Sequence, residues 1–275
     1  MPDTLPVVAG IALVAWAYLR GLSRLWARAG AGRGTHRWQA GCFLAGLTAV
    51  LAVLATPFGH LADDRLWAHM VQHVTLVAVA APLLVLGNPM VTLSWALPAD
   101  VRAGLSSGGR RLWRGHARHY TAWAALALGA HTAALWIWHV PGPYEAALRS
   151  GPLHALEHAT LFYTALAFWW VVAGTRRRAL YGPGVLVTFA AALQGSALGA
   201  LMTLASKPWY PSHLQGTGSP TGLTPLEDQQ VAGVIMWGPC GLIYALAAVL
   251  LFAAWIRQAE PGAWARAETG GAGPA

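Results

Sequence analysis

Residues 66–86 read LWAHMVQHVTLVAVAAPLLVL, an apolar stretch whose only ionisable side chains are His69 and His73. About 20 predominantly apolar residues make a helix long enough to cross the hydrocarbon core of a membrane. An ionisable side chain in such a helix is costly unless it faces the protein interior, where it marks a functional site. The stretch therefore predicts a transmembrane helix, opened by the capping residues Asp63 and Asp64, with two histidines four residues apart on one of its faces.

Apolar stretches of this length recur along all 275 residues. Only 10% of the residues are charged and 56% are hydrophobic, whereas about a quarter of an ordinary soluble domain is charged. We predict an all-α fold, a polytopic membrane helix bundle with seven transmembrane helices in a single domain, residues 1–258. The expected spans are residues 5–26, 38–56, 66–86, 120–140, 152–173, 186–204 and 231–256, and residues 259–275 are expected to form a disordered cytoplasmic tail.

Lysine and arginine are distributed unevenly between the two sides of this predicted bundle. Fifteen of the 18 fall in connections on one side, and only Arg65, Arg149 and Lys207 fall on the other. Cytoplasmic loops carry the excess of positive charge, so we expect the N-terminus outside and the C-terminus in the cytoplasm. The formal net charge of +8 is then a topology signal with some attraction to anionic lipids of the bilayer, and no nucleic acid partner is expected.

Three predicted helices carry histidines near the outer side of the membrane. His154 and His158 form a second pair at i,i+4 spacing, and His139 ends the helix before them. With a rise of about 1.5 Å per residue, all these side chains and the first pair lie within roughly 15 Å of the outer interface. Neutral imidazole binds copper, zinc, iron and nickel. The expected metal ligands are His69, His73, His139, His154 and His158.

Other polar or soft side chains lie at comparable levels. Glu157 is placed to hold a ring tautomer as an outer-shell acceptor, while Met70 and Met236 offer thioethers and Cys240 follows one turn later. Soft sulfur beside imidazole favours copper over zinc. The alternative for Met236 and Cys240 is ordinary packing. His131 is a further candidate, although a histidine within a membrane also bonds neighbouring helices.

Four separated motifs resemble the CtaG-type cytochrome c oxidase assembly factors, a seven-helix membrane family associated with caa-type oxidases. The motifs are HMVQHVTLVAVAAPLLVLGNP (69–89), LWIWHVPGPYEAAL (135–148), LHALEHATLFYTALAFWW (153–170) and LEDQQVAGVIMW (226–237). The resemblance covers about residues 66–251, and the first two helices match by hydropathy alone. It points to His69, His73, His139, Tyr144, His154, Glu157, His158, Asp228, Gln229 and Met236.

The resemblance implies a multi-pass protein of the bacterial inner (plasma) membrane that is not itself an enzyme. Its role would be to bind copper and to assist copper insertion into the catalytic subunit of a haem-copper oxidase, its partner. An external copper donor is a second expected partner. Whether the protein forms a homo-oligomer stays open.

Two other functions and one structural interpretation stay open from the residues alone. The sequence His154-Ala-Leu-Glu157-His158 has the H-x-x-E-H spacing of some zinc metalloproteases, which would make the protein a membrane-embedded zinc hydrolase with Glu157 as its base. Two histidines on facing helices, such as His73 and His158, would suit a bis-histidine haem. A structural bundle whose histidines only bond neighbouring helices is the remaining interpretation.

Overall fold

The computed structural model describes residues 4–104, 119–174, 180–212 and 222–259. These residues form helices and contain no strand, which confirms the predicted all-α fold. The helices are α1 (Thr4–Ala29), α2 (Arg37–Leu54), α3 (Phe58–Asp64), α4 (Leu66–Val74), η1 (Thr75–Ala80), α5 (Ala81–Leu86), α6 (Pro89–Ser94), α8 (Tyr120–His139), α9 (Pro141–Arg149), α10 (Gly151–Ala173), α11 (Tyr181–Thr203) and α12 (Pro225–Ala259).

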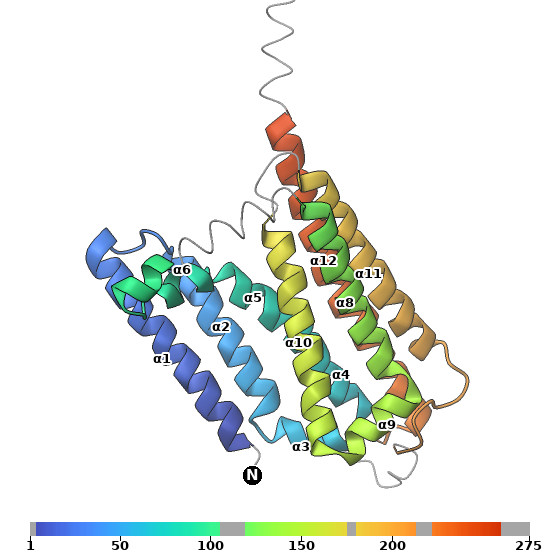
Figure 1. Ribbon diagram of the computed structural model, residues 1–275. Helices are drawn as coiled ribbons and strands as arrows, with labels where there is room; N and C mark the ends of the chain where they lie inside the picture. Colours follow the sequence, from blue (N-terminus) through green and yellow to red (C-terminus); the bar gives the residue numbers. More distant parts are fainter. Residues whose placement is uncertain (1–3, 105–118, 175–179, 213–221, 260–275) are drawn as a thin grey trace, which may run out of the picture.

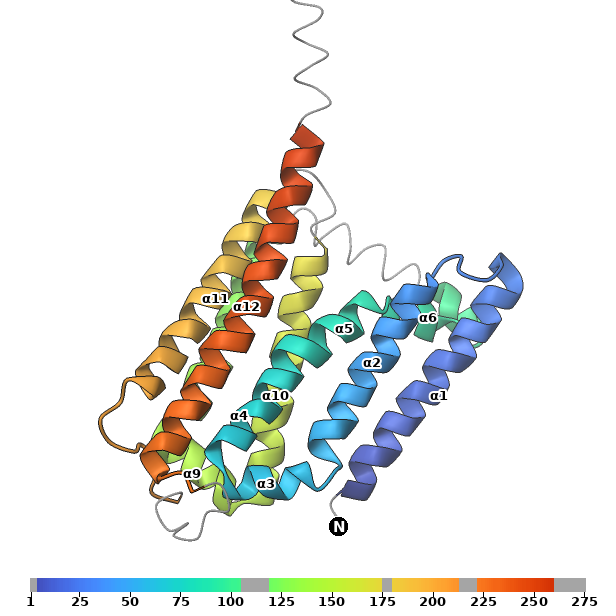
Figure 2. The ribbon, with the colours of Figure 1, turned by 180° about the vertical axis from the view of Figure 1, so that it is seen from behind.

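The long helices lie side by side, and the chain changes direction from one to the next (Figures 1 and 2). The helices α1 and α2 form one edge of the bundle, and α8, α11 and α12 form the other. Between these groups lie α10 and the continuous stretch α4, η1 and α5. The short helices α3 and α9 lie at the end of the bundle where α1 begins (Figure 1). This arrangement puts the beginnings of α4 and α10, and the end of α8, at one end of the molecule.

A single turn of wide π-helix, η1, interrupts the stretch 66–86. Pro82 follows it, and proline has no N–H and crowds the carbonyl four residues earlier, so a regular α-helix is disfavoured here. The backbone N–H of Ala81 instead bonds to the carbonyl of Leu76, which leaves the Val77 carbonyl without a helical donor. Trp169 of α10 fills this role with an indole N–H···O bond of 2.9 Å. The proline thus produces an attachment point that fixes α10 against the stretch 66–86.

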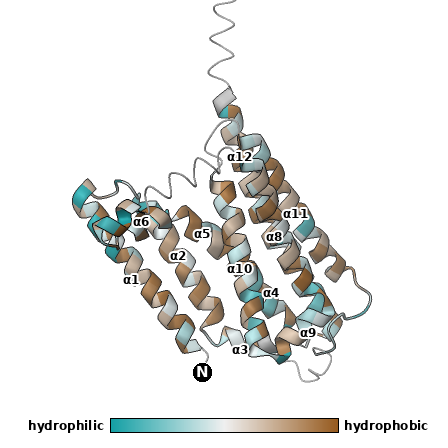
Figure 3. Cartoon of the chain, viewed as in Figure 1, coloured by the Kyte–Doolittle hydropathy of each residue, from teal (hydrophilic) through white to brown (hydrophobic). Residues whose placement is uncertain are grey.

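Five helices of the described residues are long and apolar enough to cross a membrane: Thr4–Ala29, Arg37–Leu54, Leu66–Leu86, Tyr181–Thr203 and Pro225–Arg257. Large hydrophobic side chains are exposed along them, among them Leu186 (69%) and Leu242 (74%), and Figure 3 shows hydrophobic residues along the length of the long helices. Such surfaces are stable in lipid and not in water. The helices α8 and α10 are not among the five, and both contain histidine and tryptophan, which lower the hydropathy of a helix.

Two expectations fall partly outside the described residues. The predicted cytoplasmic tail, residues 259–275, lies outside them except for Ala259, which is the last residue of α12. Of the arginines used for the orientation, Arg110, Arg111, Arg114, Arg118, Arg176, Arg177, Arg178 and Arg266 also lie outside the described residues.

Candidate metal centre

The first histidine pair is held by the way α4 begins. We expected Asp63 and Asp64 to cap this helix, but α3 continues through Asp64, and Arg65, the actual N-cap residue, provides no side-chain cap. The cap comes from the far end of the sequence. Asp228 of α12 accepts hydrogen bonds from the backbone N–H groups of Leu66 (3.1 Å) and Trp67 (3.0 Å) with its two carboxylate oxygens. A carboxylate at this position satisfies two free N–H groups and stabilises the positive end of the helix.

His69 and His73 lie one turn apart on the buried face of α4, with 0% and 3% of their surface exposed. Their rings are 4.3 Å apart, measured between centroids. This proximity follows from the helix itself, because side chains at i and i+4 point to the same side. Both imidazole rings therefore point toward the element that packs opposite α4.

Opposite α4 lies the first part of α10, with His154, Glu157 and His158 on a single face. Glu157 is fully buried, and its Oε1 atom lies 3.5 Å from the Nε2 atoms of both His69 and His73. His154 and His158 are half-buried, with ring centroids 4.5 Å apart. One carboxylate thus faces two imidazoles of the other helix, and two more imidazoles flank it.

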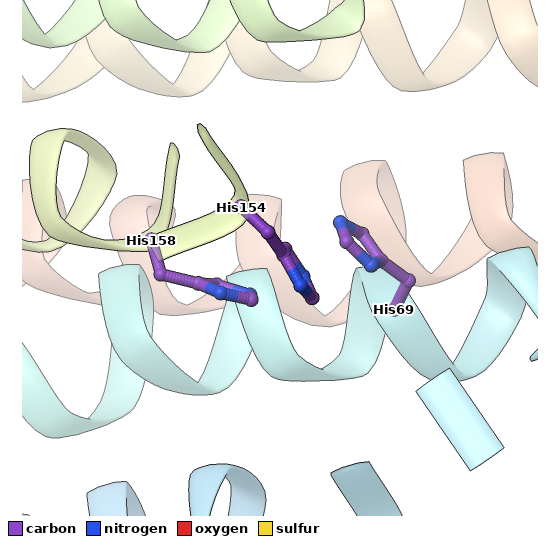
Figure 4. Close-up of side chains that lie close together, drawn as sticks. All are labelled: His69, His154 and His158. Atoms are coloured by element: carbon purple, nitrogen blue, oxygen red, sulfur yellow. The ribbon is translucent and has the colours of Figure 1, made fainter. Parts of the chain in front are cut away.

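The imidazoles of the two helices converge (Figure 4). The ring of His69 lies 5.3 Å from that of His154 and 5.6 Å from that of His158. Two groups have ligand atoms that all lie within 4.8 Å of one another: His69 with His154 and His158, and His69 with His73 and Glu157. Around one tetrahedral ion the ligand atoms are about 3.3 Å apart, given metal–nitrogen bonds of about 2.0 Å. The ligand atoms would therefore have to approach one another when an ion binds.

Several polar atoms of this cluster are buried with no hydrogen-bond partner among the residues that the structure describes. They are both ring nitrogens of His73, the Nε2 atom of His158 and the Oε2 atom of Glu157. Each buried polar atom left without a partner costs about 1–3 kcal/mol. An arrangement that leaves several of them facing one region is typical of a site that receives an ion. The donor set, imidazole nitrogen and one carboxylate, suits a divalent or monovalent transition metal.

His139, the last residue of α8, extends the cluster on the side of His73, with 5.8 Å between the two ring centroids. Its Nδ1 atom lies 2.7 Å from the Leu135 carbonyl oxygen, and its Nε2 atom lies 3.3 Å from the sulfur of Met70. Met70 is fully buried beside His69 in the sequence of α4. The structure therefore brings all five predicted imidazole ligands, Glu157 and Met70 into one region.

The end of the cluster is covered by α9 and the segment 205–212. Tyr144 of α9 is fully buried, with its ring 5.3 Å from that of His69 and 4.3 Å from that of Tyr210. The hydroxyl of Tyr210 donates a 2.9 Å hydrogen bond to the backbone carbonyl of His139. Burial raises the pKa of Tyr210 above its ordinary value, so the hydroxyl remains protonated and available as the donor.

Two further contacts hold this cover in place. The side chain of Glu145 on α9 accepts hydrogen bonds from the backbone N–H (3.0 Å) and the hydroxyl of Ser212. Gln229 accepts a 2.6 Å bond from the backbone N–H of Trp209. Tyr210 was not among the predicted residues. Its only signal in the sequence is an aromatic pair enclosed by Pro208 and Pro211.

The other predicted residues lie elsewhere. Asp228 is bound to the backbone of α4, as described above, and so acts as a cap. Met236, Cys240 and His131 line a cavity of about 30 Å³ that extends from His73 between α8, α11 and α12, and the Nε2 atom of His131 lies 3.1 Å from the Tyr244 hydroxyl. A cavity of this size holds about two water molecules. All three residues line this cavity together with His73, and His131 and Cys240 belong to neither ligand group.

Comparison with known proteins identifies the family. The profile described as cytochrome c oxidase caa3 assembly factor matches residues 16–258, a range that contains every residue of the cluster and of its cover. No curated protein and no solved structure matches the chain at a significant level. Because the match extends over most of its length, the chain belongs to the cytochrome c oxidase caa3 assembly factor family.

Proposed function

We propose that the protein binds copper through the histidines of α4, α8 and α10 and assists the insertion of that copper into the catalytic subunit of a cytochrome c oxidase. The observation that carries this proposal is the convergence of His69, His73, His154 and His158 around the buried carboxylate of Glu157. A cluster with several buried polar atoms lacking partners is hard to explain as packing. The family match indicates the process, which is assembly of the oxidase. The donor atoms of the cluster indicate that the cargo is copper.

The topology that we propose has seven spans, with α8 and α10 crossing the membrane in addition to the five most apolar helices. The alternating directions of the long helices support it (Figures 1 and 2). So does the excess of arginine and lysine in the connections on one side, 15 against 3. In this orientation the N-terminus is outside, the C-terminus is in the cytoplasm of a bacterium, and the imidazole cluster lies in the outer half of the inner membrane, where an external copper donor has access.

Copper is a better cargo than zinc or haem for two reasons. The thioether of Met70 beside the imidazoles favours a soft ion. The rings of His73 and His158 are only 5.2 Å apart, and the neighbouring cavity of about 30 Å³ is far smaller than a porphyrin. These dimensions support a single ion more than a haem between the two histidines.

The difference in burial within the cluster favours delivery to a membrane partner over storage. The ligands on α4 are buried, whereas His154 and His158 on α10 are half-buried. A carrier needs a coordination position that is accessible to the acceptor, since a closed set of four protein ligands is typical of structural sites. We propose that the half-buried pair faces the oxidase subunit. No catalytic step is required for this role, and the protein is proposed to be an assembly factor and not an enzyme.

Metal analysis of the purified protein tests the proposal. We expect copper in the wild-type protein and a loss of most of it in His69→Ala and His158→Ala, one variant from each helix. His119→Ala, which removes an exposed histidine at the other end of α8, serves as the control and should keep its copper. The oxidase made in the same cells should contain less copper with the first two variants only. Intact metal content and intact oxidase copper in both variants would overturn the proposal.

A further inference from the structure

The contact between His139 and Met70 is unusual in chemical terms. The two side chains come from α8 and α4, are exposed to 3% and 0%, and bring Nε2 and the thioether sulfur to 3.3 Å. The other ring nitrogen, Nδ1, lies 2.7 Å from the Leu135 carbonyl oxygen. A carbonyl oxygen only accepts hydrogen bonds, so Nδ1 must carry the hydrogen.

In a neutral imidazole with hydrogen on Nδ1, the Nε2 atom presents a lone pair. The thioether sulfur of Met70 also has only lone pairs to offer. Two acceptors therefore face each other at 3.3 Å inside the protein. A proton or a metal cation between the two atoms would turn this contact into an attractive one. A proton would turn His139 into a buried imidazolium with a weak thioether acceptor, which is costly far from water.

The distance between the two atoms suits a shared metal ion. With a metal–nitrogen bond of about 2.0 Å and a metal–sulfur bond of about 2.3 Å, a separation of 3.3 Å corresponds to an angle of about 100° at the metal. This angle at the metal is close to the tetrahedral value. A thioether ligand favours the soft Cu(I) ion, whereas a set of imidazole and carboxylate ligands also suits harder divalent ions.

We propose that His139 and Met70 form a second binding position that takes Cu(I), beside the region where the two ligand groups share His69. This inference rests on the proposed copper-binding function and adds to it the oxidation state of the cargo. His73 connects the two positions, because its ring is 5.2 Å from that of His158 and 5.8 Å from that of His139. In the described part of the chain neither of its ring nitrogens has a hydrogen-bond partner, so it is a candidate for the third ligand of the Cu(I) ion. The cluster then has two connected positions, one nonselective and one specific for the soft ion.

The test uses the full-length protein, purified in detergent without oxygen and titrated with Cu(I) against a chromophoric Cu(I) chelator, and separately with Zn²⁺. The variant is Met70→Leu, which conserves volume and is tolerated in most cores. Met202→Leu is the matched control, since Met202 is also fully buried but lies on α11. We expect Met70→Leu to lower the affinity for Cu(I) by more than the roughly tenfold loss typical of an altered outer-shell residue, with an unchanged affinity for Zn²⁺. Met202→Leu should change neither.

X-ray absorption of the wild-type protein loaded with one equivalent of Cu(I) provides a second measurement that does not depend on the variant folding. We expect a sulfur neighbour at about 2.3 Å from the copper. Cu(I) that binds with no sulfur neighbour, or equally well to Met70→Leu, would refute the second position and leave the proposed function standing. A wild-type protein that binds no copper at all would instead refute the proposed function.

Discussion

The Oδ1 atom of Asp228 accepts a 3.0 Å hydrogen bond from the backbone N–H of Trp67, although 161 residues separate the two in the sequence. The other carboxylate oxygen accepts a bond from Leu66. The start of α4, and with it the position of His69 one turn later, is thereby tied to the start of α12. The two hydrogen bonds of Asp228 therefore help to position His69 in the candidate site.

Replacing Asp228 with alanine should destabilise the protein without removing a metal ligand. Two backbone N–H groups would lose charged acceptors in a buried place, which we expect to lower the free energy of unfolding by about 1–3 kcal/mol. The measurement is thermal unfolding of the purified protein in detergent. Asp64→Ala is the control, because Asp64 is exposed and its loss should change stability by less than about 0.5 kcal/mol. Equal shifts for the two variants would contradict the capping role.

Replacing Glu157 with glutamine should reduce the binding of metal. Among the described residues, Glu157 is the one acidic residue in a ligand group with His69 and His73, at 3.5 Å from each, and the amide keeps the shape while losing the charge. We expect copper affinity to fall by about tenfold or more, measured by competition with a chelator. Asp64→Asn is the control, since Asp64 is exposed and lies in neither ligand group.

The same Glu157→Gln variant also separates the assembly factor from the zinc hydrolase. In a hydrolase with the H-x-x-E-H arrangement the glutamate acts as a base, so the variant would keep its metal and lose turnover. A variant with full metal content and a lost hydrolytic activity would therefore favour the enzyme. Reduced metal content together with reduced copper in the oxidase is the result that we expect.

Replacing Tyr210 with phenylalanine should open the cover over the cluster. The substitution removes the hydrogen bond to the His139 carbonyl, which is worth about 1 kcal/mol. If the cover must move before copper leaves, the rate of copper removal by excess chelator should rise roughly fivefold, the factor that corresponds to about 1 kcal/mol. Tyr163→Phe is the control, because the side chain of Tyr163 is 67% exposed. Equal release rates for the two variants would exclude Tyr210 from the control of release.

The sequence predicts the parts of the site that depend on one helix alone. Helical geometry is enough to put His69 and His73 on one face, and His154 and His158 on another. Charge asymmetry and apolar length also suffice for an all-α membrane protein. These inferences need no knowledge of which helix packs against which.

Contacts between helices could not be predicted in this way. The family motif indicates Asp228 as a site residue, but its partners, the N–H groups at the start of α4, can be identified only when α12 lies beside α4. Periodicity also says nothing about the contact of His139 with Met70, because these residues belong to different helices. Tyr210 lies in a segment without periodicity, where sequence patterns predict turns and not contacts.

The helices α11 and α12 pack closely because each has a glycine where the two backbones meet. A methyl group at Gly233 would lie 2.6 Å from the Gly199 carbonyl oxygen, and one at Gly199 would lie 2.8 Å from the Gly233 carbonyl oxygen. Helices in membranes associate through such small residues, since lipid removes the hydrophobic drive between them. Gly233→Ala should therefore force the helices apart.

We expect Gly233→Ala to lower the free energy of unfolding by about 1–3 kcal/mol, measured by thermal unfolding in detergent. Gly129→Ala in α8 is the control, because a methyl group at Gly129 meets nothing within 4 Å, and alanine is the better helix former by about 1 kcal/mol. The two variants should therefore shift stability in opposite directions. A neutral effect of Gly233→Ala would mean that α11 and α12 can separate without cost. In that case the attachment of α12 to α4 through Asp228 would carry more of the stability of the bundle than the glycine contact.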